Sequence, residues 1–299
     1  MLRPRIERIS HLGIAVPSHE PALGAVKASS RLEGHTALVT GASRGLGLGI
    51  IKALARAGAE VWAVAENAEE LERACATVSG PAPLHPIVAD LRRKTDAARL
   101  IAAVQQQRPR LSLLVNNAAL QPLKSLSDTD DSTWDAALAV NLTAPFLLTR
   151  MAVPLMRDSG GAVINVSARA GFEGFACEAA YCATKFGLEG FTRAAALELE
   201  PLGIAVNSAI PGARIKPTGV EQAVFDALPA DERAQYRDPV TFAPAIELLA
   251  LLRGRPSGLR FDLARLTDDV ARLGFDAALA SAATLAEFRA SDLMSPTQP

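Results

Sequence analysis

The chain has 299 residues, of which 49% are hydrophobic and 21% are charged, so it is long enough to bury one large core. Its formal net charge of -1 provides no overall field that would favour nucleic acid or a membrane surface, and we expect a small-molecule partner. The three cysteines, Cys75, Cys177 and Cys182, cannot all pair, and the four histidines lack metal-ligand spacing. The longest apolar runs, such as residues 248–252, fall well short of the roughly 20 residues of a membrane helix. We therefore expect a soluble, cytoplasmic protein with no metal, no nucleic-acid partner and no membrane partner.

Residues 1–34 precede the first predicted strand and contain no sustained apolar core of a secretory signal, so we interpret them as an N-terminal extension. From residue 35 to residue 262, strand-like apolar runs alternate with helical patterns. This alternation is typical of an α/β domain with a doubly wound parallel sheet of about seven strands and helices on both faces. Residues 263–299 then read as a C-terminal helical extension and tail. The predicted strands cover residues 35–40, 60–66, 85–90, 111–116, 162–167, 205–210 and 258–262.

Three closely spaced glycines, Gly41, Gly45 and Gly47, separate the first predicted strand from a helical pattern. Glycine allows a tight turn, close approach of a pyrophosphate and close packing of the new helix on the strand. The helix points its first N–H groups and the positive end of its dipole at that phosphate. The stretch therefore predicts a dinucleotide-binding turn.

The segment from Thr40 to Gly47 resembles the cofactor loop of the short-chain dehydrogenase/reductases, and further motifs of that family follow in order. The resemblance spans roughly residues 35–262 and implies a Rossmann fold. It also implies an NAD(P)-dependent oxidoreductase that interconverts an alcohol and a ketone or aldehyde by hydride transfer. A homodimer or homotetramer would assemble through two long helices, 133–157 and 179–200. The further motifs are Asp90-Leu91, Asn116 to Ala119, Asn141, the Tyr-X-X-X-Lys motif of Tyr181 and Lys185, and Pro211-Gly212.

By the same resemblance, one set of residues would border the cofactor. Glu66 ends the second predicted strand, where a carboxylate can accept hydrogen bonds from the adenine ribose of NAD. Arg44 resembles the basic residue of NADP-preferring members. A Glu66 carboxylate about 4 Å from a phosphate would cost on the order of 4 kcal/mol, so we lean slightly to NAD over NADP. The alternative for Glu66 is a solvated strand end. The full predicted set is Gly41, Ser43, Arg44, Gly45, Leu46, Gly47, Glu66, Asp90, Leu91, Asn117, Ala118, Tyr181, Lys185, Pro211 and Gly212.

The catalytic candidates are Tyr181, Lys185 and Asn141. Tyr181 and Lys185 are four residues apart in a helical segment, so both side chains lie on one face. A nearby ammonium stabilises a phenolate, which brings the tyrosine pKa nearer neutrality for proton exchange with a substrate oxygen. The resemblance implies that Lys185 also holds the nicotinamide ribose and that Asn141 anchors the water of a proton relay.

The family places a serine hydroxyl thirteen residues before the tyrosine, but this chain has Ala168 there. The preceding residue, Ser167, should point away unless the strand end bulges, because neighbouring residues on a strand face opposite sides. Loss of one donor to a developing oxyanion typically costs about 10² to 10³ in rate. We therefore expect an impaired enzyme, with a non-catalytic dinucleotide-binding sensor or scaffold as the alternative. A substrate lid is expected over residues 213–236.

Overall fold

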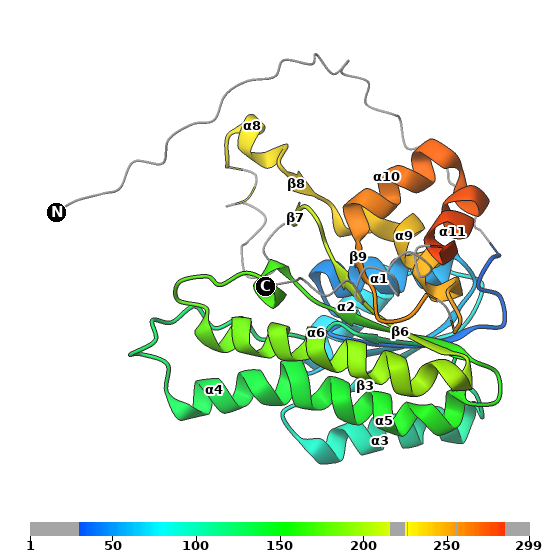
Figure 1. The fold of residues 1–299 in the computed structure, drawn as a ribbon, viewed down its shortest axis with the longest axis horizontal. Helices are drawn as coiled ribbons and strands as arrows, with labels where there is room; N and C mark the ends of the chain where they lie inside the picture. The colour runs from blue at the N-terminus through cyan, green and yellow to red at the C-terminus, as the bar shows by residue number, and fades with distance from the viewer. Residues whose placement is uncertain (1–29, 216–224, 226, 255, 285–299) are drawn as a thin grey trace, which may run out of the picture.

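The computed structural model describes residues 30–215, 225, 227–254 and 256–284 (Figure 1). Most of the predicted N-terminal extension and the tail after residue 284 lie outside this part of the chain.

Seven parallel strands form the central sheet in the order β3-β2-β1-β4-β5-β6-β9 (Figure 1). The order turns back at β1, from which the chain winds first toward β3 and then toward β9, so the predicted doubly wound α/β fold is confirmed. Each strand coincides with a predicted one to within two residues. The strands are β1 Thr36–Thr40, β2 Glu60–Ala65, β3 Leu84–Val88, β4 Leu113–Asn116, β5 Gly161–Val166, β6 Ile204–Ile210 and β9 Arg260–Asp262.

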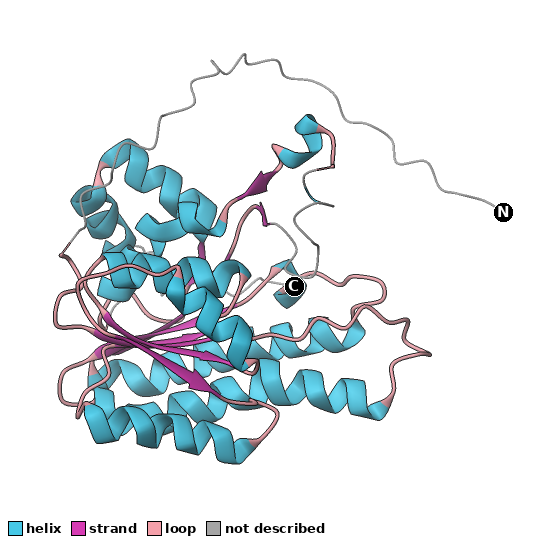
Figure 2. Cartoon of the chain, turned by 180° about the vertical axis from the view of Figure 1, so that it is seen from behind, coloured by secondary structure: helices cyan, strands magenta, loops and turns pink. Residues whose placement is uncertain are grey.

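Helices cover both faces of the sheet (Figures 1 and 2). Because side chains alternate along a strand, Ala37 and Val39 of β1 enter one core while Leu38 enters the other. Helices α1, α9, α10 and α11 close the first core, and α3, α5 and α6 close the second. The helices are α1 Gly45–Arg56, α2 Ala68–Ala76, α3 Lys94–Gln107, α4 Asp131–Leu138, α5 Ala144–Met156, α6 Ala179–Leu199, α8 Ala230–Arg233, α9 Ala243–Leu251, α10 Leu263–Leu273 and α11 Phe275–Thr284.

The helix predicted over residues 133–157 is α4 and α5 joined by a π-helical turn, Ala139–Thr143. This continuous segment, Asp131–Met156, is long and apolar enough to cross a membrane, with a mean hydropathy of 1.5 over its most apolar 18 residues. Half of its most apolar stretch is buried in the protein. Leu148 and Ala152 pack in the core beneath the sheet, which accounts for its apolar character.

The segment after Asp262 continues into α10 and α11. Leu263 and Leu266 of α10 and Ala278 of α11 are buried in the same core as α1 and α9. The described part of the C-terminal helical extension therefore packs as part of the sheet domain.

The predicted lid region begins and ends with a two-stranded parallel pair, β7 Arg214–Ile215 and β8 Tyr236–Arg237. Residues 216–224 lie outside the described part of the chain.

Candidate active site

The turn after β1 has a backbone conformation and close contacts that only glycine fits at its key positions. Gly41 and Gly45 have φ values of 66° and 54°, in the left-handed region that favours glycine. A Cβ at Gly47 would lie 1.9 Å from the Gly41 carbonyl oxygen. Helix α1 starts at Gly45, and its N-cap residue Arg44 makes no side-chain capping bond. The turn and the uncapped helix start fit a dinucleotide pyrophosphate.

Thr40 and Asn117 fasten this turn to the end of β4. Thr40 Oγ1 accepts from the backbone N–H groups of Asn117 at 3.0 Å and Ala118 at 3.1 Å. Asn117 Nδ2 donates to the carbonyls of Thr40 at 2.9 Å and Gly41 at 3.1 Å. The Asn117 side chain thus shapes the turn. This role of Thr40 was not predicted from the sequence, where the available signal was a threonine directly before the first glycine of the turn.

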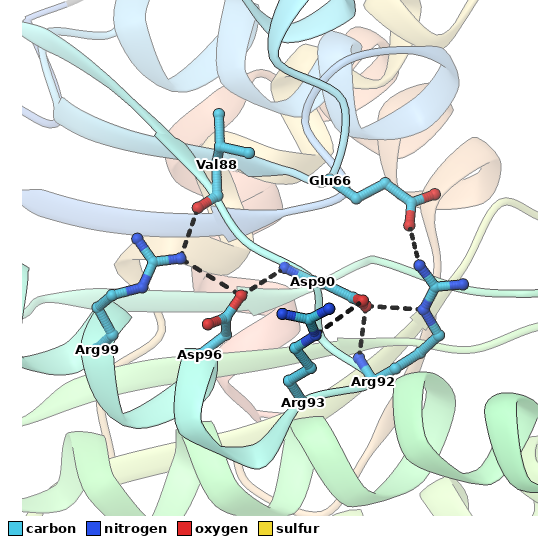
Figure 3. A network of polar contacts seen from close by, with 7 residues as sticks. All are labelled: Glu66, Val88, Asp90, Arg92, Arg93, Asp96 and Arg99. Atoms are coloured by element: carbon cyan, nitrogen blue, oxygen red, sulfur yellow. Dashed lines mark hydrogen bonds and ion pairs between the residues drawn. The ribbon is translucent and has the colours of Figure 1, made fainter.

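At the ends of β2 and β3, two carboxylates share one arginine (Figure 3). Arg92 Nη2 donates to Glu66 Oε2 at 3.2 Å, and Arg92 Nε donates to Asp90 Oδ1 at 2.8 Å. The Arg92 hydrogen bond is the main cause that holds the pKa of Asp90 below its usual value. Arg93 Nε lies 3.7 Å from the same carboxylate, and the Asp90 N–H donates to Asp96 at 2.8 Å. The Asp90 side chain is therefore committed to the turn that it begins.

The neighbouring Leu91 is partly buried and packs against the core formed by α3, α5 and α6.

A second acid, Glu70 of α2, lies beside the glycine turn. Ser43 Oγ donates to Glu70 Oε2 at 3.4 Å, and Arg44 Nη1 lies 3.7 Å from Glu70 Oε1. Asn67 caps α2 by accepting from the Glu70 N–H at 3.0 Å. Glu70 was not predicted from the sequence, where its signal was an acidic residue in the first turn of the helix after β2.

Tyr181 and Lys185 lie one turn apart on α6, as their spacing predicted. Lys185 is buried, its Nζ donates to the Val166 carbonyl of β5 at 2.7 Å, and the same atom lies 5.5 Å from the Tyr181 ring centroid. Burial lowers the pKa of Lys185 to about 8, although the Glu189 carboxylate opposes that shift. Burial, with Glu178 and Cys182, raises the pKa of Tyr181 to about 12. The lowered tyrosine pKa expected from the sequence is thus absent in the protein alone, because burial and the two neighbouring groups all disfavour the phenolate.

Asn141 lies in the π-helical turn and is almost fully buried. Its amide pairs with both backbone groups of Leu120, each at 2.8 Å, and Nδ2 also donates to Thr184 Oγ1 at 3.0 Å. It therefore ties the loop after β4 to α6 next to Lys185. Such π-turns are frequent at functional sites.

Ser167 is buried, and Ala168 is partly exposed at the start of a 3₁₀ turn, Arg169–Gly171. Ser167 Oγ has no hydrogen-bond partner among the described residues. A Cβ at Gly171 would lie 2.8 Å from it, so the hydroxyl points beneath the turn. As strand alternation predicted, Ser167 points inward and does not replace the missing serine.

Pro211 and Gly212 follow β6 in a turn that lies against the Asp262 side chain. Gly212 has a φ of 68°, and a Cβ there would lie 1.7 Å from Asp262 Oδ1. The Pro211 carbonyl accepts from the Ala264 N–H at 3.1 Å.

Among the described residues, no group of three or more His, Cys, Asp or Glu side chains is placed to hold a metal ion.

A doubly wound sheet with a glycine turn before α1 and a tyrosine and lysine pair at the same edge defines a dinucleotide-dependent oxidoreductase. The chain belongs to the short-chain dehydrogenase family, whose sequence profile matches residues 35–227. It is an NAD(P)-dependent oxidoreductase by this membership.

Two relatives and one solved structure illustrate the similarity. The chain is 36% identical to D-beta-hydroxybutyrate dehydrogenase of Cupriavidus necator over 62% of this chain and 73% of that protein. It is 35% identical to trans-4-hydroxycyclohexanecarboxylate dehydrogenase of Sinomonas cyclohexanicum over 71% of this chain and 85% of that protein. A metagenomic short-chain oxidoreductase in complex with NADP matches with a TM-score of 0.64 and 30% identity, covering 78% of this chain and 98% of that one.

Proposed function

We propose that this enzyme interconverts an alcohol and a ketone or aldehyde, with Tyr181 exchanging the proton of the substrate oxygen. The observation that carries the proposal is the pair of Tyr181 and buried Lys185 on one face of α6, beside the end of β5. Both relatives named above act on hydroxy acids by their names. Hydroxy acids and the corresponding keto acids are therefore the first substrates to test.

The proposed cofactor is NAD or NADP, which supplies the hydride donor or acceptor when bound. The uncapped start of α1 and the turn from Gly41 to Gly47, with Ser43, Arg44, Gly45 and Leu46, would hold the pyrophosphate. Asp90, Leu91, Asn117 and Ala118 would border the adenine side, and Pro211 and Gly212 the nicotinamide side. Lys185 and Tyr181 would hold the nicotinamide ribose.

The preference between the two dinucleotides depends on the charges at the ends of β1, β2 and β3. Glu66 and Glu70 each lie next to an arginine, Arg92 and Arg44 respectively. Either acid would oppose a 2′-phosphate, whereas either arginine would favour it. We propose a slight preference for NAD. Arg92 also binds Asp90, so its guanidinium is less free to leave these carboxylates and bind a 2′-phosphate.

The proton chemistry follows from the two pKa shifts. With a pKa of about 12, Tyr181 holds its proton at neutral pH and is ready to donate it to a substrate oxygen. Lys185, with a pKa of about 8, can gain or lose a proton near the working pH. Asn141 would support the relay that carries the proton onward, because it binds the loop at Leu120 to α6. With Ala168 in place of serine, we propose a slower enzyme that lacks one donor to the reacting oxygen.

We further propose that two copies of the chain pair through α5 and α6, as a homodimer or half of a homotetramer. Phe146 of α5 is 42% exposed, and Phe186 and Leu197 of α6 are 49% and 77% exposed. Gly190, on the same face of α6, has open space around it and would allow a close approach. A soluble, cytoplasmic enzyme acting on a small molecule agrees with the near-neutral charge.

The deciding experiment is a fluorescence titration of the purified protein with NADH and NADPH, followed by turnover assays with hydroxy acids, ketones and aldehydes. We expect saturable binding and slow turnover. Binding without turnover over the whole panel would contradict the enzymatic proposal and favour a sensor or scaffold. Failure to bind either dinucleotide would contradict the cofactor assignment.

A further inference from the structure

A buried carboxylate lies one helical turn beyond Lys185 on α6. Glu189 follows Lys185 by four residues on α6, so both lie on one face of the helix, and only 4% of Glu189 is exposed. Its Oε2 accepts from Ser208 Oγ of β6 at 3.1 Å. Its Oε1 has no hydrogen-bond partner among the described residues. A buried carboxylate is costly unless a nearby charge compensates it.

One cation is within ion-pair distance of this carboxylate in the described part of the chain, and a second lies one helical turn away. Arg260 of β9 lies at the edge of ion-pair distance, with Nη1 3.9 Å from Glu189 Oε2. The Arg260 guanidinium also stacks over the Phe172 ring, 4.0 Å from its centroid, which draws it toward the surface. The other cation is the Lys185 ammonium, which is buried and whose Nζ donates to the neutral Val166 carbonyl.

We propose that Glu189 is a positioning residue that keeps Lys185 protonated inside the protein. A buried ammonium that donates to a carbonyl loses much of its hydration, and an anion one helical turn away restores part of that stabilisation. Without the anion, Lys185 would be neutral over more of the physiological pH range. The catalytic role of Glu189 rests on the proposed function, in which the Lys185 ammonium acts on Tyr181 and holds the nicotinamide ribose.

The groups around Lys185 favour this assignment. Helix α6 contributes Tyr181, whose phenol is neutral at physiological pH, and Glu189. Strand β5 contributes the Val166 carbonyl to Lys185, whereas Ser208 of β6 and Arg260 of β9 contact Glu189, so Arg260 competes with the lysine for the Glu189 charge. Glu189 is thus the anion that lies one helical turn from Lys185 on the same face of α6.

The test is a pH titration of Lys185 itself. The titration is monitored by NMR on protein labelled with ¹³C at lysine Cε. The chain holds six lysines, so the signals are few, and Lys185→Arg identifies the one of interest. We expect Glu189→Gln, which keeps the shape and removes the charge, to lower the Lys185 pKa by about half a unit or more. The matched control is Glu198→Gln, an exposed glutamate later in the same helix, which should leave the titration unchanged. An unchanged Lys185 pKa in Glu189→Gln overturns the proposal.

A second variant acts in the opposite direction. Arg260→Gln removes the competing cation, and because the Arg260 side chain is 32% exposed, the variant should fold. We expect the Lys185 pKa to rise in this variant; a fall or no change overturns the proposal even if Glu189→Gln does not fold. Neither titration requires cofactor or substrate. An NADH titration of the same samples therefore reports on the proposed function separately.

Discussion

The Arg92 guanidinium donates to the Glu66 carboxylate at 3.2 Å (Figure 3). The acid that the sequence assigns to the adenine ribose is therefore already paired with a cation from the turn after β3. Both side chains are about half exposed, at 51% for Arg92 and 58% for Glu66, so a ligand could reach either partner. The cofactor preference then depends on which partner faces the ribose.

Arg92→Ala removes the cation and leaves the Glu66 charge uncompensated. We expect the affinity for NADPH to fall by about threefold to tenfold relative to NADH, a modest change because solvent screens exposed charges. The measurement is the ratio of the two dissociation constants. Arg93→Ala is the control, because Arg93 lies 3.7 Å from Asp90 and is more exposed. An equal change in both variants would show that Arg92 has no special role.

Glu66→Arg should shift the ratio of the two dissociation constants in favour of NADPH binding. An unchanged ratio would rule Glu66 out of the ribose site.

Ala168→Ser restores the hydroxyl at the start of the 3₁₀ turn. We expect kcat to rise by about tenfold or more with any substrate that the wild type turns over, because one donor to the reacting oxygen is regained. Ser167→Ala is the control. Its hydroxyl is buried and has no hydrogen-bond partner in the part of the chain that the structure describes, so its removal should leave kcat unchanged and stability equal or slightly higher. No gain from Ala168→Ser would mean that another group already serves the oxyanion.

Gly47→Ala should abolish dinucleotide binding and lower the free energy of unfolding by about 1 to 3 kcal/mol, because its Cβ would meet the Gly41 carbonyl at 1.9 Å. Gly174→Ala, where a Cβ would meet no atom within 4 Å, should change neither quantity appreciably. Thermal unfolding and NADH titration measure both effects. Normal binding by Gly47→Ala would disprove the proposed pyrophosphate site.

Phe146→Glu combined with Phe186→Glu places charges on the exposed face of α5 and α6. We expect the assembly to dissociate into monomers, which light scattering coupled to gel filtration would detect, because buried like charges at a two-fold interface repel. Leu126→Glu, at a 78% exposed position in the loop before α4, is the control. An oligomer that survives the double substitution would place the interface elsewhere.

His35 should make stability depend on pH. Burial, and then the Arg253 guanidinium at 2.6 Å, lower the pKa of His35 below its usual 6.5. The unfolded chain therefore binds more protons near pH 6.5 than the folded protein, so stability rises with pH and is lost as the pH falls through this window. Urea unfolding at pH 5.5 and 7.5 measures the slope. His35→Gln should reduce it, and an equal slope in both proteins would assign the effect to other groups.

The sequence by itself determined the fold class and the order of the family motifs along the chain. Strand and helix periodicities, with glycines at turns that need positive φ, specify a parallel doubly wound sheet, and the motifs lie either after the carboxyl end of a strand or in a following helix. Strand alternation likewise predicted that Ser167 points inward, because that property depends on neighbouring residues alone.

The tertiary structure alone decided which groups are paired. Arg92 reaches Glu66 from a turn 26 residues away, and Ser208 and Arg260 reach Glu189 from two separate strands. The burial that raises the pKa of Tyr181 also depends on all the elements around α6. Such contacts join residues far apart in the chain, and their electrostatic effect depends on distance and burial, which spacing in the sequence does not contain.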